Sequence, residues 1–181
     1  MRVIAGSAKG VRLAPVPAGT RPVSDRAREG LFSSLGQGVV GARVLDLFAG
    51  TGAMGIEALS RGASSALFVD SSPAAVRVIG DNLRRARMPA RGMIRRQDVR
   101  QAIRQGPGQF DLVILDPPYA VPPTELDGVI SEIAGQGVVS AGGRVVLTRP
   151  AKGYTPVIPL DWLLVKRLSY GEAVIAVFQI P

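Results

Sequence analysis

The sequence predicts an α/β domain built on a mostly parallel sheet and completed by an antiparallel hairpin. Apolar runs of strand length alternate with segments of helical periodicity from residue 43 onward, and this alternation is typical of parallel strands covered by helices. The chain ends differently, on two apolar runs joined by a short polar turn, as in a β-hairpin. Its 181 residues, 46% of them hydrophobic, suffice for one domain with a sizeable core but not for two.

The predicted strands are short apolar runs that stop at turn residues or at a carboxylate. The parallel strands are expected over 44–48, 66–70, 92–97, 111–116 and 143–148, and the hairpin strands over 162–168 and 173–180. The strand over 92–97 has the weakest pattern, because arginines interrupt it.

Capping residues delimit the predicted helices. A helix over 53–61 ends at Gly62, a residue type that suits the position after a helix. Ser72 is a good N-cap and Pro73 a good first residue for a helix that ends near residue 87. Thr124 is expected to cap a further helix that ends near residue 134.

Residues 1–42 are predicted to form an extension in front of the α/β domain, which we place at 43–181. Segments 2–5 and 11–14 are expected to pair as a small β-hairpin, and Ser24 to cap a helix that follows a proline-containing link. A piece of about 40 residues buries too little surface to fold alone. The extension is therefore expected to pack on the main domain.

The chain contains no cysteine and no histidine. This composition excludes disulfides, metal sites built on thiolate or imidazole, and catalysis by Ser–His or Cys–His pairs. It also excludes methyl transfer to pyrimidine C5 through a cysteine nucleophile. We therefore expect that the protein binds no metal. Its chemistry is expected to depend on carboxylates, tyrosine, lysine, backbone groups and an organic cofactor. No apolar run approaches the roughly 18 residues of a membrane span, and the first residues do not resemble a signal peptide, so we expect a cytoplasmic protein without a membrane partner.

Basic residues outnumber acidic ones by 22 to 14, which gives a net charge of +8. Nine arginines lie between residues 77 and 104, and six further basic residues lie in the first 42. Such clusters suit a polyanion, because each neutralised phosphate releases condensed counterions. Nucleic acid is thus the favoured partner, and a solvated, arginine-rich surface is the alternative.

A glycine-rich turn follows the strand predicted over 44–48. Gly50, Gly52 and Gly55 have the spacing G-x-G-x-x-G, which permits a tight turn and close approach of a ligand to the helix N-terminus. That spacing fits a hydride-transfer enzyme and an S-adenosylmethionine enzyme almost equally. Asp46 favours the second, because a carboxylate there would repel a pyrophosphate but would suit the amino group or sulfonium of S-adenosylmethionine.

Two further carboxylates follow the next strands. Asp70 can accept hydrogen bonds from both ribose hydroxyls of a nucleoside. Asp98 can meet an adenine amino group or, as an equal alternative, cap the short helix that follows it. With Asp46, Phe48, Gly50 and Gly52, they make up the predicted cofactor site.

The tetrapeptide Asp116-Pro117-Pro118-Tyr119 follows the strand predicted over 111–116. The two prolines hold the backbone rigid and extended. The Asp116 carboxylate and the Pro117 carbonyl can then accept hydrogen bonds from an exocyclic amino group, so that its lone pair is aligned for methylation. Tyr119 can stack on a base that has left its helix. Asp116, Pro117 and Tyr119 are the predicted catalytic residues, and a structural proline turn is the alternative.

Segments 2–10, 19–32, 45–63 and 116–119 together resemble the bacterial 16S ribosomal RNA guanine-N2 methyltransferases of the RsmD family. The resemblance implies a class I S-adenosylmethionine-dependent methyltransferase fold, Rossmann-like, with a C-terminal hairpin that inserts one antiparallel strand. It implies methylation of guanine 966 on the assembling small ribosomal subunit. The resemblance also makes the N-terminal hairpin part of the RNA-binding surface, so that Arg2, Lys9, Arg12 and Arg21 are the expected substrate-binding residues. We expect the protein to be a monomer.

The chain departs from the family in two places. Tyr119 stands where the family usually has phenylalanine, and either ring can stack on a base. Thr148 and Arg149 stand where the family tends to have glutamate. A role for that carboxylate is therefore not expected in this chain.

Three other functions are compatible with parts of the sequence. A DNA adenine-N6 methyltransferase shares the tetrapeptide, but this chain has no room for the usual target-recognition region. An NAD-dependent oxidoreductase shares the glycines, but leaves the tetrapeptide and the arginines unexplained. A non-catalytic RNA-binding factor would keep the basic surface and need neither Asp46 nor Asp116.

Overall fold

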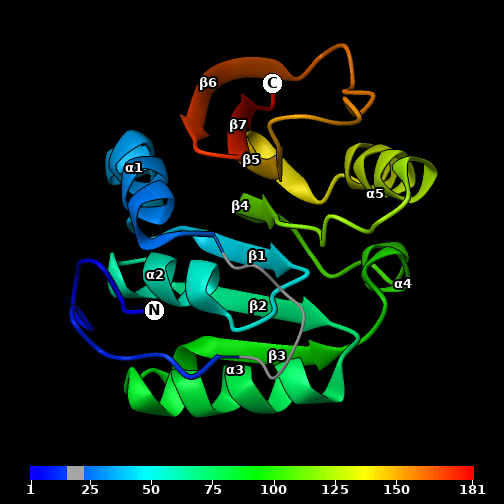
Figure 1. Ribbon diagram of the computed structural model, residues 1–181. Coiled ribbons are helices and arrows are strands. Elements are labelled where there is room, and N and C mark those ends of the chain that lie inside the picture. Colours follow the sequence, from blue (N-terminus) through cyan, green and yellow to red (C-terminus); the bar gives the residue numbers. More distant parts are fainter. Residues whose placement is uncertain (16–22) are drawn as a thin grey trace.

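The computed structural model describes residues 1–15 and 23–181. A seven-stranded sheet forms the centre of the molecule, with strand order β3-β2-β1-β4-β5-β7-β6 (Figure 1). The first five strands are parallel, and β7 is antiparallel to both β5 and β6. The strands are β1 Arg43–Leu47, β2 Ser65–Asp70, β3 Gly92–Arg96, β4 Phe110–Leu115, β5 Val139–Pro150, β6 Leu163–Tyr170 and β7 Ala173–Gln179. All seven predicted strands are present, and β5 begins four residues earlier than expected.

Helices cover both faces of the sheet (Figure 1). Buried side chains of α1, α2 and α3 pack on one face, and those of α4 and α5 on the other. The helices are α1 Asp25–Leu35, α2 Ala53–Ser60, α3 Pro73–Arg85, α4 Val99–Arg104 and α5 Pro123–Gly135, with short 3-10 turns at Gly36–Val39 and Pro89–Arg91. None of the helices in the described part of the chain is both long and apolar enough to cross a bilayer.

Two predicted helix caps are confirmed and one is wrong. The Ser24 and Ser72 hydroxyls accept hydrogen bonds from the backbone N–H groups of Ala27 and Ala75. Thr124, by contrast, lies inside the first turn of α5, and Pro122 occupies the N-cap. The consecutive prolines 122 and 123 fix φ near helical values, and Pro123 needs no N–H partner at the first position. The helix therefore starts before the threonine.

The N-terminal extension packs directly on α2 and shares its hydrophobic core. Segments 2–5 and 11–14 pair through one antiparallel bridge, Arg2 to Arg12, rather than through full strands. Val3, Ala8 and Leu13 are buried in the same cluster as the apolar residues of α2. The extension therefore depends on the main domain for its burial, as expected from its size.

Glu57 of α2 holds the extension in place. Its buried carboxylate accepts hydrogen bonds from the backbone N–H groups of Ile4, at 2.8 Å, and Ala5, at 3.1 Å. It also pairs with Arg61, at 2.7 Å. Arg28 of α1 is fully buried nearby, with Nε 3.7 Å from the same carboxylate, and it donates to the Arg2 carbonyl. Buried charges need such partners, because an isolated ion in the interior is costly.

Candidate functional site

A cleft of about 830 Å³ opens at the carboxyl ends of the parallel strands. This is the edge at which open α/β sheets bind ligands, beside the point where the strand order reverses between β1 and β4. The cleft brings together most of the residues predicted from sequence, namely Asp46, Phe48, Gly50, Asp70, Asp98, Asp116, Pro117 and Tyr119. Gly52 does not line it, and neither do Arg2, Lys9 or Arg12. Arg21 lies outside the described residues.

The glycine turn shapes the floor of the cleft. Gly52 has φ +74° and is the N-cap of α2, so it lets the chain turn from the strand into the helix. A side chain at Gly55 would overlap the Phe68 ring, so this glycine allows α2 to pack closely on the sheet. Phe48 has φ +58°, a strained value for a residue with a side chain. Such strain is typical of functional turns.

Asp46 belongs to β1 rather than to the loop, and its carboxylate is buried. The Gly55 N–H donates to Asp46 Oδ2 at 2.9 Å. Burial raises the pKa of Asp46 well above its usual value, and the nearby carboxylates of Asp116 and Asp70 raise it further. A cation bound in the cleft would reverse this effect and stabilise the ionised form.

Asp70 and Asp98 are held by backbone hydrogen bonds. Asp70 Oδ2 accepts from the Gly50 N–H at 2.8 Å, and Oδ1 accepts from the Ser72 N–H at 2.9 Å. Each oxygen has a second lone pair that can still accept from a ligand hydroxyl. Asp98 Oδ1 accepts from the Gln101 N–H at 3.0 Å, so this residue does cap α4. Its side chain nevertheless lines the cleft.

Asp116 directly follows β4, the strand that pairs with β1, and it lines the cleft. Burial raises the pKa of Asp116 to about 7, although the Thr148 hydroxyl beside it lowers that pKa. Pro117 is buried, whereas Tyr119 is 47% exposed and offers its ring to solvent at the cleft. A deep acceptor with an exposed aromatic ring nearby suits a planar base that enters from outside.

The cleft is acidic although the protein as a whole is basic. Among the described residues, the charged side chains that line it are Arg28 and the six carboxylates Asp46, Asp70, Asp98, Asp116, Glu125 and Glu172. The net charge of the protein is +8. An acidic cleft attracts a cationic ligand and repels a pyrophosphate. It therefore argues against a nicotinamide dinucleotide.

Sequence reasoning missed several cleft residues. Thr148 of β5 and the β6–β7 turn, with Tyr170 and Glu172, line the cleft, as does Arg28 of α1. Thr148 carried one signal, since it is a polar residue that ends an aliphatic run. Arg28 lies in segment 19–32, which resembles the family, but only the fold brings it and the β6–β7 turn to the cleft.

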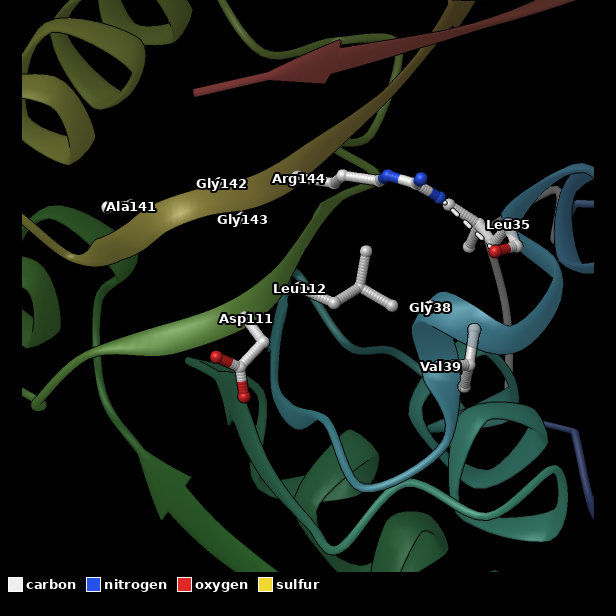
Figure 2. A pocket seen from close by; sticks show the side chains of 9 residues that line it. All are labelled: Leu35, Gly38, Val39, Asp111, Leu112, Ala141, Gly142, Gly143 and Arg144. Atoms are coloured by element: carbon white, nitrogen blue, oxygen red, sulfur yellow. Dashed lines mark hydrogen bonds between the residues drawn. The ribbon is translucent and has the colours of Figure 1, made fainter. Parts of the chain in front are cut away.

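A second cavity, of about 170 Å³, lies at the opposite edge of the sheet. Figure 2 shows Arg144 extending along it toward α1, where its guanidinium donates to the Leu35 carbonyl at 3.2 Å. Asp111 accepts a hydrogen bond from the Arg43 N–H at 2.8 Å. The two charged residues of this cavity, Asp111 and Arg144, thus already have protein partners. None of the residues predicted for function line the cavity.

Four of the arginines between residues 77 and 104 bind within the protein. Arg100 and Arg104 both pair with Glu132, Arg84 pairs with Asp81, and Arg91 donates to the carbonyls of Leu59 and Ala63. On the extension, Arg2, Lys9 and Arg12 are exposed.

Comparisons with known proteins agree with this geometry. Ribosomal RNA small subunit methyltransferase D of Escherichia coli K12 is 29% identical, over 99% of this chain and 89% of that protein. YlbH of Bacillus subtilis 168 is 32% identical, over 99% of this chain and 98% of that protein. The solved structure of yhhF from Escherichia coli superposes with a TM-score of 0.88 at 29% identity, over 99% of this chain and 97% of that chain. That of a hypothetical protein from Thermus thermophilus gives 0.81 at 34% identity, over 99% of each chain.

In the sheet, β7 lies between β5 and β6 and is antiparallel to both. This is the class I S-adenosylmethionine-dependent methyltransferase fold that the resemblance implied. A family model described as "Conserved hypothetical protein 95" matches residues 1–179. The chain therefore belongs to this family, the RsmD family that its sequence motifs resemble.

Proposed function

We propose that the protein transfers a methyl group from S-adenosylmethionine to the exocyclic N2 amino group of a guanine in 16S ribosomal RNA, guanine 966. One observation carries this proposal: Asp46 on β1 and Asp116 after the neighbouring strand β4 line one acidic cleft and are close enough for their charges to interact. An acceptor for a substrate amino group thus lies beside an acceptor for a cationic cofactor. Relatives named as methyltransferases of small-subunit ribosomal RNA support the RNA substrate.

The cleft residues fit S-adenosylmethionine, which supplies an electrophilic methyl group on a sulfonium. Asp46 would attract its cationic end, because a bound cation would offset the cost of ionising this buried carboxylate beside Asp116 and Asp70. Asp70 would accept hydrogen bonds from the ribose hydroxyls, and Asp98 one from the adenine amino group. The backbone at Phe48 and Gly50 would form the surface against which the nucleoside lies.

Asp116 and Pro117 would act on the substrate amino group. An exocyclic amino group is a weak nucleophile, because its lone pair is delocalised into the ring. Acceptors on both of its N–H groups turn the lone pair toward the methyl donor and stabilise the positive charge that develops on nitrogen. The Asp116 carboxylate must be ionised to accept in this way. The exposed Tyr119 ring would hold the base by stacking.

The RNA-binding surface would lie on the extension. Arg2, Lys9 and Arg12 are exposed on it, and Arg21 belongs to the same predicted set. These side chains can neutralise phosphates around the base that enters the cleft. We propose that the enzyme acts as a monomer, on the assembling small subunit.

The experiment that tests this function is nucleoside mass spectrometry after reaction with labelled S-adenosylmethionine. Three substrates are offered, namely naked 16S ribosomal RNA, small-subunit assembly particles and duplex DNA. The proposal predicts labelled N2-methylguanosine at position 966 in RNA, with the highest yield from the particles. N6-methyladenine in DNA, or no labelled nucleoside from any substrate, would overturn it.

A further inference from the structure

Thr148 stands out among the cleft residues that the proposed mechanism leaves without a role. It ends a run of β5 whose other members, Val145, Val146 and Leu147, are aliphatic and at most 4% exposed. Thr148 itself is 2% exposed. Valine has the same shape as threonine and would fill this position without a polar atom. The hydroxyl therefore calls for a chemical explanation.

The sheet register places Thr148 beside Asp116. The parallel strands β4 and β5 pair up to Leu115 and Leu147, and Asp116 and Thr148 are the next residues on each strand. On the other side of Thr148, β7 presents Ile175, which offers no side-chain acceptor. Both Asp116 and Thr148 line the cleft. The Asp116 carboxylate is thus the neighbouring side-chain acceptor for the Thr148 hydroxyl.

The hydroxyl is buried without a hydrogen-bond partner of regular geometry among the described residues. It lies close enough to Asp116, however, to lower the pKa of that carboxyl. Catalytic hydrogen bonds are often long or poorly aligned until a substrate binds. A buried hydroxyl left unpaired is costly, so the alignment is favoured once the carboxylate is ionised.

We infer that Thr148 is a positioning residue, whose hydroxyl donates to one Asp116 oxygen and thereby directs the other oxygen toward the substrate amino group. The pairing of Thr148 with Asp116 does not depend on the proposed function, whereas the orientation toward a substrate amino group rests on it. A hydroxyl has a single proton to donate. It therefore occupies one carboxylate oxygen and leaves the second as the acceptor for the base.

Among the described residues, no charged group donates a hydrogen bond to the Asp116 carboxylate. Its charge raises the pKa of Asp46 on β1, in addition to the larger effect of burial. The other titratable groups among the described residues that line the cleft are Tyr119 on its own loop, Arg28, Asp70, Asp98, Glu125, Tyr170 and Glu172. Among the described side chains, Thr148 is the one that lowers the pKa of Asp116, against the larger effect of burial. Removing its hydroxyl should therefore raise that pKa.

The first test is a carbon-13 NMR titration of aspartate carboxyl groups, without cofactor or RNA. The parent protein is compared with Thr148→Val and Thr148→Ser, and Asp116→Asn and Asp46→Asn variants assign the signals. The Asp116 midpoint, about 7 in the parent, should move to higher pH in Thr148→Val and return in Thr148→Ser. An unchanged midpoint in a folded Thr148→Val protein would overturn the inference, since valine preserves the packing.

The second test is the pH profile of single-turnover methyl transfer. Because the ionised carboxylate is the acceptor, the Thr148→Val rate should fall roughly tenfold at neutral pH, and the deficit should shrink as the pH rises. Affinity for S-adenosylhomocysteine should not change. A deficit equal at every pH would contradict a role through Asp116. If no variant, including the parent, transfers methyl groups, the proposed function fails, and the NMR titration still decides whether Thr148 and Asp116 are paired.

Discussion

The Asp70 carboxylate at the end of β2 accepts a 2.8 Å hydrogen bond from the Gly50 N–H in the turn after β1. This bond joins two segments that the sequence separates by twenty residues. It fixes the glycine turn against the carboxylate proposed to bind the cofactor ribose. The two halves of the proposed cofactor site are therefore coupled, and a change at one should be measurable at the other.

Replacing Asp70 by alanine should weaken binding of S-adenosylhomocysteine by about 1–3 kcal/mol, because ribose hydroxyls and the Gly50 N–H would lose their acceptor. Isothermal titration calorimetry measures this effect. Asp81→Ala is the matched control, since this exposed aspartate pairs with Arg84 on α3 and does not line the cleft. Equal affinity in the parent and in Asp70→Ala would rule out the ribose assignment.

Replacing Glu57 by alanine should lower the free energy of unfolding by about 3–5 kcal/mol, because it removes one partner of a buried ion pair and strands two backbone N–H groups of the extension. Urea denaturation measures the loss. Glu132→Ala is the control: it also removes a carboxylate shared by two arginines, but at a partly exposed site, where ion pairs contribute little. Similar losses in the two variants would show that Glu57 is not the anchor of the extension.

The double variant Lys9→Gln/Arg12→Gln should bind small-subunit particles more weakly and with a shallower salt dependence, since each phosphate contact contributes to the slope. Filter binding at several salt concentrations gives both quantities. Arg100→Gln/Arg104→Gln removes the same charge but takes arginines already held by Glu132, and should change RNA binding less. The RNA-binding surface is elsewhere if the two double variants behave alike.

The sequence predicted the strands and the carboxylates well for a common physical reason. Parallel strands buried on both faces are continuous apolar runs, and the residue that ends each run necessarily lies at the ligand-binding edge. Asp70 and Asp116 could be placed in this way, whereas Asp46 lies within β1, ahead of Leu47. The N-cap of α5 could not be placed from sequence, because a helix can start at Thr124 or at the two prolines before it.

Other parts of the site depend on contacts between distant segments. Arg28 and the turn at Gly171 reach the cleft only because α1 packs beside β6, where a side chain at Gly30 would overlap Tyr170. Local periodicity has no information on such contacts. Likewise, the composition gives the positive charge of the protein, but only the fold shows that the cleft is lined mainly by carboxylates.

Tyr119→Phe should retain most methyl transfer, because the ring can still stack, whereas Tyr119→Ala should lose roughly 1–3 kcal/mol of base binding. Single-turnover assays over a range of particle concentrations separate the binding effect from the chemical step. A Tyr119→Phe variant as inactive as Tyr119→Ala would assign a chemical role to the hydroxyl instead of stacking.

The most direct test of the proposed chemistry is Asp116→Ala, assayed in two ways on the same preparation. Calorimetry with S-adenosylhomocysteine should give nearly the parent affinity, because the carboxylate acts on the substrate rather than on the cofactor. Single-turnover methyl transfer to small-subunit particles should fall by about 10²–10³, the typical loss when one positioned electrostatic contact is removed. An Asp116→Ala variant that transfers methyl groups at the parent rate would contradict the central role given to this carboxylate.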